Sequence, residues 1–81
     1  MKQPTQRKNI VGENVWYFRR LRGLSRQELA AAMTVAGLPT TAARLGRMER
    51  GLVRVCDREV LALCALLGRT PEELLLPVHE V

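Results

Sequence analysis

The chain has 81 residues, which is enough for one small domain whose single core is only just large enough to be stable. It is 47% hydrophobic but has only three aromatic residues, so a core built from Leu, Val, Ala and Met is expected, which favours helices over a sheet. Thirteen Lys and Arg against eight Asp and Glu give a formal charge of +5, which points to a polyanionic partner, although many small basic proteins bind none.

The N-terminal segment is polar and contains a proline and three cations, Lys2, Arg7 and Lys8. Such a segment is typical either of a solvated leader or of a basic arm that lies along a DNA backbone or enters a minor groove. We expect residues 1–8 to be a basic flexible arm, residues 9–76 to be the domain, and residues 77–81 to be a C-terminal tail.

A first helix is expected from just after Asn9 to about Arg22. Its buried stripe is predicted from apolar residues at helical spacing, Val11, Val15 and Phe18. Trp16 lies off this stripe. It either rests on Arg20 one turn later, as a cation–π contact, or forms part of a partner-binding or dimer surface.

Residues 24–51 contain two short helical patterns joined by a turn with Gly and Pro at residues 36–39. Ser25 followed by Glu28 is a capping box, which starts the first pattern. The second pattern starts at Thr40 or Thr41 and ends at Gly51. The buried positions share one helical face in each pattern, namely Leu29, Ala30 and Met33 in the first and Leu45 and Met48 in the second.

A fourth helix is expected over residues 57–67, capped by Cys56 or Asp57, with an inner face of Val60, Leu61, Cys64 and Leu67. Thr70, Pro71 and Glu73 predict the start of a short fifth helix, which Pro77 stops. The remaining apolar residues either complete the core or form a patch that a second protomer covers. We expect a homodimer through this set: Leu63, Leu66, Leu74, Leu75, Leu76 and Val78.

The sequence predicts neither an enzyme nor a cofactor or metal ion. His79 is the lone histidine, so a Ser/His/Asp set and a four-ligand zinc site are both missing. Cys56 and Cys64 would be about 12 Å apart in one helix, too far for a disulfide. An apolar leader and a run of eighteen apolar residues are also missing, so we expect a cytoplasmic location.

The order of these features resembles the lambda-repressor-like, or XRE, family of helix-turn-helix DNA-binding domains, over residues 10–76. The central matches are Leu24-Ser25, Gln27-Glu28-Leu29-Ala30, Leu45, Met48, Glu49 and Gly51. The flanking matches are Gly12, Val15, Phe18 and Arg19 upstream and Asp57, Glu59, Leu61, Leu67-Gly68 and Pro71-Glu72-Glu73-Leu74-Leu75 downstream. The segment between Met33 and Thr41 is about five residues longer than the commonest family spacing, and we expect this difference to change the angle of the second central helix.

The resemblance implies an all-α fold of five helices, in which the helix around residues 41–50 enters the major groove. It also implies that Arg19 pairs with Glu49. The DNA-binding positions that it implies, together with the arginines around them, are Arg26, Gln27, Thr40, Thr41, Ala42, Ala43, Arg44, Arg47, Arg50 and Arg54. Arg44 and Arg47 are expected to read guanines and Arg26 to hold the backbone, unless these arginines form only a solvated basic face.

The function expected from this resemblance is sequence-specific DNA binding by a transcriptional regulator, with double-stranded DNA as the partner of a homodimer. The alternative is a protein-interaction module of the same fold, an antitoxin or accessory subunit, which binds through Trp16 and the Leu-rich end.

Gly46 weakens the helix that carries it relative to Ala, which suggests close helix packing at this position.

Overall fold

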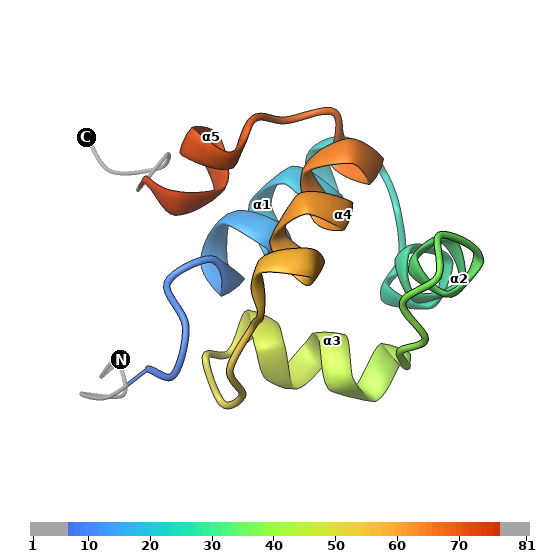
Figure 1. Cartoon of the computed structure of the whole chain (residues 1–81), viewed down its shortest axis with the longest axis horizontal. Helices are drawn as coiled ribbons and strands as arrows, with labels where there is room; N and C mark the ends of the chain where they lie inside the picture. Colours follow the sequence, from blue (N-terminus) through green and yellow to red (C-terminus); the bar gives the residue numbers. More distant parts are fainter. Residues whose placement is uncertain (1–6, 77–81) are drawn as a thin grey trace.

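The computed structural model of the protein describes residues 7–76 and forms five α-helices (Figure 1). In chain order these are α1 (Gly12–Leu21), α2 (Arg26–Val35), α3 (Ala42–Glu49), α4 (Asp57–Leu67) and α5 (Pro71–Leu75). The described part of the chain contains no strand, which confirms the expected all-α class. None of its helices has the length and apolar character needed to cross a membrane.

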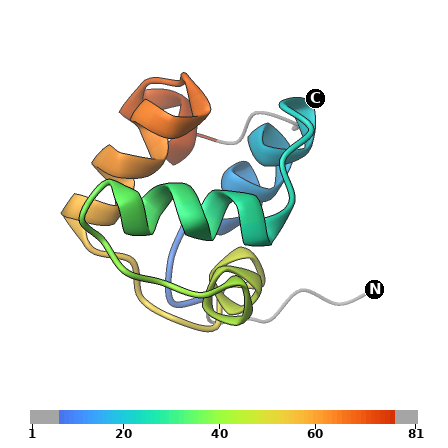
Figure 2. The same ribbon diagram turned by 90° about the vertical axis from the view of Figure 1, so that its right-hand side faces the viewer.

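The helices surround a central pair, α1 and α4, with α3 across one end and α5 at the other (Figure 1). Figure 1 looks along α2 while α3 runs across the view, and in Figure 2 the two roles are exchanged. Helices α2 and α3 therefore cross at a steep angle. Because α3 packs against both α1 and α2, its inner face is covered and its outer face is left to solvent.

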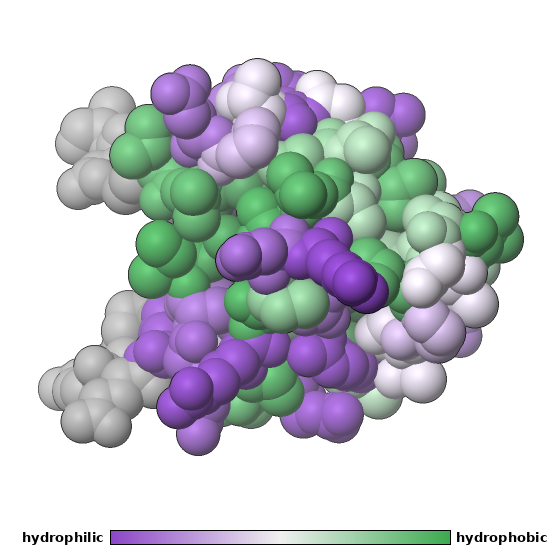
Figure 3. Space-filling view, viewed as in Figure 1, coloured by the Kyte–Doolittle hydropathy of each residue, from purple (hydrophilic) through white to green (hydrophobic). Residues whose placement is uncertain are grey.

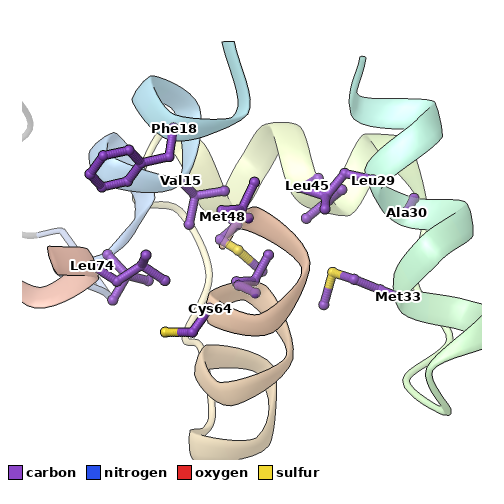
Figure 4. Packing of buried hydrophobic residues seen from close by; sticks show 12 residues of the cluster. Val15, Phe18, Leu29, Ala30, Met33, Leu45, Met48, Cys64 and Leu74 are labelled. Atoms are coloured by element: carbon purple, nitrogen blue, oxygen red, sulfur yellow. The ribbon is translucent and has the colours of Figure 1, made fainter. Parts of the chain in front are cut away.

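Every helix contributes to a single apolar core (Figure 4). Its members are Val11, Val15, Phe18, Leu29, Ala30, Met33, Leu45, Met48, Leu63, Cys64, Leu67 and Leu74. The faces predicted for the first three helices are confirmed, because all their predicted residues are at most 5% exposed. Helical periodicity is sufficient to identify the buried face of these three helices, because each has a polar side opposite the apolar one.

The face predicted for α4 is partly wrong. Leu61 was expected to point inward but is 61% exposed, whereas Leu63 is fully buried. The helix is apolar at most of its positions from residue 60 to 67, so periodicity cannot select its inner side. That side is set by contacts with α1, α2 and α5.

This arrangement also corrects the membership of the expected dimer patch. Leu63 and Leu74 are fully buried in the protomer, so neither can face a second copy. Leu66 is half-buried against the core, and Leu75 and Leu76 remain exposed. Val78, the last member, lies outside the described residues.

The helix starts follow the capping signals of the sequence. Ser25 and Glu28 form the expected capping box, as do Thr70 and Glu73. Of the alternatives, Thr41 caps α3 and Cys56 caps α4. These residues accept or donate the hydrogen bonds that the first turn of a helix leaves unmade.

The segment before α1 is packed against the C-terminal end of α3. Arg7 Nη2 donates to the carbonyl of Glu49 at 2.9 Å, and the Lys8 amide donates to the carbonyl of Gly51 at 2.8 Å. Asn9 Nδ2 donates to the carbonyls of Met48, at 3.1 Å, and Val53, at 2.8 Å. Arg7 and Lys8 therefore belong to the folded unit and not to an arm, and the rest of the expected arm lies outside the described residues.

Candidate nucleic-acid interface

The outer face of α3 is held in place by the residues on its inner face. Leu45 and Met48 are fully buried, while Ala43 and Arg47 are exposed one turn apart, and Arg50 follows at the end of the helix. In Figure 3 the surface is mainly hydrophilic where Figure 1 places α3 and the loop after it. A rigidly anchored helix with an exposed basic side is thus available to a polyanion.

Glu49 ties α3 to the two helices beside it. Its Oε2 accepts from Arg19 Nε at 2.7 Å, and its Oε1 accepts from Arg19 Nη2 at 3.2 Å and from Arg26 Nε at 3.0 Å. The Arg19 and Glu49 side chains are only 8% and 3% exposed. The pair that the resemblance implied is therefore present, and it fixes the orientation of α3 relative to α1 and α2.

Arg26, in the first turn of α2, reaches across to Glu49 of α3. Its side chain is 45% exposed and makes this bond through Nε, so its terminal nitrogens remain available on the outside. It was expected to hold a DNA backbone, and its position at the first turn of α2 is compatible with that role. Gln27, the next residue, is also exposed.

Gly46 lies beneath two guanidinium groups. A Cβ added there would be 3.6 Å from Arg26 Nε and 3.7 Å from Arg50 Nη1, which are ordinary contact distances. The close helix packing that the sequence suggested at Gly46 does not require a glycine there, because the nearest atoms are side-chain atoms at ordinary contact distances. Glu49 bonds both Arg26 and Arg19, whereas the charge of Arg50 has no bonded carboxylate among the described residues.

Arg44 does not lie free on the outer face. Its Nη1 donates to Glu59 Oε2 at 2.5 Å, and its Nη2 donates to the carbonyl of Arg54 at 3.1 Å. The side chain thus joins α3 to the loop that follows it and to the first turn of α4. The sequence signal for this contact is weak, because the partner carboxylate lies fifteen residues away and also belongs to the cap of α4.

The other residues expected to contact DNA differ in how far their side chains are exposed and already hydrogen-bonded. Thr40 Oγ1 is buried without a hydrogen-bond partner in the described chain, and Thr41 Oγ1 accepts from the amide of Arg44. Ala42 is half-buried and Ala43 is exposed. The exposed arginines whose side chains form no hydrogen bond or ion pair among the described residues include Arg47, Arg50 and Arg54.

Asn9 is the residue at this interface that sequence reasoning missed. It is 9% exposed, its Oδ1 accepts from the amide of Gly12 at 2.7 Å, and its amide group donates to the carbonyl of Met48 in α3 and to that of Val53 in the loop that follows. An Asn before a helix reads as an N-cap, but the two carbonyl contacts cross about forty residues of chain. Only the tertiary structure could reveal them.

The sequence also singled out Trp16 and the two cysteines. Arg20 Cζ lies 5.1 Å from the ring centre of Trp16, which is 43% exposed, so the expected cation–π contact is confirmed. Cys56 and Cys64 are free thiols, and burial raises the pKa of Cys64. Among residues 7–76, no group of three or more His, Cys, Asp or Glu could hold a metal ion.

Comparison with protein-family models, with curated proteins and with solved structures found no match.

Proposed function

We propose that this protein binds double-stranded DNA as a lambda-repressor-like helix-turn-helix domain and regulates transcription, with α3 in the major groove. One observation carries the proposal. The inner side of α3 is fixed by Leu45, Met48 and Glu49, while its outer side presents Arg47 and Arg50 without internal partners among the described residues. A cationic helix that is both exposed and rigidly held suits groove binding.

The arginines around α3 support contacts with phosphate. Arg26 of α2 and Arg50 at the end of α3 both lie beside Gly46, and Arg54 is exposed on the following loop. A guanidinium group donates several hydrogen bonds in one plane, which matches the oxygens of a phosphate. The proposal assigns these three residues to the DNA backbone, where they set affinity and orientation.

A homodimer on a two-fold-related site is part of the same proposal. Leu75 and Leu76 leave exposed apolar surface at the end of α5, and half-buried Leu66 lies in the neighbouring helix. A dimer that places two α3 helices in successive major grooves requires half-sites about one helical turn, roughly 34 Å, apart. Substitution of Leu75 and Leu76 by Ser should then lower the apparent mass in solution.

The decisive experiment is a salt titration of binding to a random-sequence duplex. Removal of one phosphate-binding side chain should reduce the slope of log K against log salt by about 0.9. We expect this reduction for Arg50→Ala and Arg54→Ala. Arg20→Ala, which removes the exposed cation that lies over the Trp16 ring, should leave the slope unchanged.

Failure to bind any duplex at low salt would contradict the proposal. So would equal slopes for the wild-type protein and the Arg50 and Arg54 variants. Either result would favour the alternative of a protein-interaction module, in which the exposed Trp16 and the apolar end of α5 contact another protein.

A further inference from the structure

We infer that base readout by this domain is reduced to one dominant guanine in each half-site, contacted by Arg47, and that Arg44 is a positioning residue that reads no base. The inference rests on the proposed DNA binding and adds the chemistry that the site recognises. It follows from the side chains at the start of α3, the part of a recognition helix that approaches base edges.

The first turn of α3 offers few side-chain groups that could bind a base. Ala42 and Ala43 have no polar side-chain atom, Thr40 Oγ1 is buried, and the Thr41 hydroxyl is held at the start of the helix by the bond that it accepts from the Arg44 amide. Arg44 completes the turn, but its guanidinium is bound on two sides. Exposed Arg47, one turn later, is therefore the first residue of α3 whose guanidinium has no bonded partner among the described residues.

The bonds that Arg44 makes inside the protein hold its side chain strongly in place. Its bond to Glu59 joins two ionised groups, the Glu59 side chain is only 14% exposed, and charge-assisted bonds of this kind are stronger than neutral ones. The same carboxylate accepts from the Cys56 amide through Oε1. Turning Arg44 toward a base would leave a mostly buried carboxylate without its bonded counter-charge and release the loop carbonyl at Arg54.

The other polar groups at the interface lie where backbone contacts are expected. Gln27 belongs to α2, the helix that crosses the DNA backbone in this docking geometry, and Arg26 and Arg50 both lie beside Gly46. Among the residues of α3 itself, Ala42–Glu49, Arg47 is the exposed arginine whose guanidinium has no partner in the described chain; Arg50 has none either, but it lies at the C-cap, at the far end of the helix from its first turn. Its planar fork matches the O6 and N7 acceptors of guanine in the major groove.

Selection from a random duplex library tests this inference. We expect one strongly preferred guanine per half-site, whose replacement weakens binding about 5- to 150-fold. Replacement by 7-deazaguanine, which lacks N7, should weaken binding of the wild-type protein. Replacement by inosine, which keeps O6 and N7, should not. Arg47→Ala should bind guanine, inosine and 7-deazaguanine duplexes equally.

Two further variants test the role of Arg44. Arg44→Ala removes the side chain, and Glu59→Gln removes the charge that holds it while keeping the side-chain oxygen that accepts from the Cys56 amide. Both should lower the thermal midpoint yet select the same motif as the wild-type protein. Circular dichroism confirms that each variant is folded at the selection temperature.

Several results would overturn the inference. One is a motif in which Arg44→Ala loses a base preference that Glu59→Gln retains, because Arg44 would then be a reader. Another is salt-dependent binding without a preferred guanine, which would leave the proposed DNA binding intact and refute only the readout by Arg47. Lack of any binding to random duplex would refute both.

Discussion

Arg19 and Glu49 meet at 2.7 Å inside the fold, and neither side chain is more than 8% exposed. The pair joins α1 to α3, and a hydrogen bond from Arg26 connects α2 to the same Glu49 carboxylate. Arg19 Nη1 also donates to the carbonyl of Leu24 at 2.8 Å, so the turn before α2 depends on it as well. The orientation of α3 is therefore coupled to one buried charge.

Removal of that charge should be costly. Glu49→Gln keeps the side-chain volume but leaves the buried guanidinium of Arg19 without a counter-charge, so we expect a loss of about 3–5 kcal/mol in the free energy of unfolding. Arg19→Lys, the matched control, keeps the charge but cannot bond both carboxylate oxygens and the Leu24 carbonyl, and a smaller loss is expected. Urea denaturation measures both, and a loss under about 1 kcal/mol for Glu49→Gln would disprove the structural role.

Two glycines should respond in opposite directions to the same substitution. At Gly46 an added Cβ makes only ordinary contacts with side chains, so Gly46→Ala should stabilise the protein by about 0.5–1 kcal/mol through helix propensity. At Gly12 an added Cβ would overlap the carbonyl oxygen of Met48, so Gly12→Ala should destabilise it by about 1–3 kcal/mol. Thermal melts of both variants provide the comparison. Destabilisation by both would mean that Gly46 has a tighter environment than its contacts indicate.

The two thiols should differ in reactivity. Cys56 is exposed at the start of α4, whereas Cys64 is 6% exposed and its pKa is raised by burial, with a further contribution from Glu73. A raised pKa leaves less thiolate, the reactive form, at any given pH. Mass spectrometry after brief iodoacetamide treatment should therefore find one modified residue, Cys56, and both after denaturation. Rapid labelling of Cys64 in the native protein would contradict the packing of α4.

The cap of α5 should make stability depend on pH in the acidic range. The Thr70 amide, and to a lesser extent Arg69, lower the pKa of Glu73 relative to an ordinary glutamate. The ionised form thus stabilises the fold above the pKa of the unfolded chain, and this contribution disappears as pH falls through the lower folded pKa. We expect Glu73→Gln to lower the thermal midpoint at neutral pH but not in acid. Glu72→Gln, which leaves the capping box intact, is the control, and an equal pH dependence of the two variants would refute the assignment.

Local patterns of the sequence were enough to predict the helical architecture. Capping boxes at Ser25 and Thr70 depend on residues three positions apart, and the stripes of α1 to α3 depend on neighbours one turn apart. Interactions of such short range operate before distant segments meet, so the chain sequence alone predicts them. The all-α class follows for the same reason.

The tertiary structure alone decided which arginines remain free. Arg44 and Arg47 look equivalent in the sequence, but Glu59 binds the first and no described carboxylate binds the second. The inner side of α4 and the docking of Asn9 against α3 were decided in the same way, by residues far away along the chain. Charge pairing and burial depend on distances in space, which a pattern of neighbouring residues does not contain.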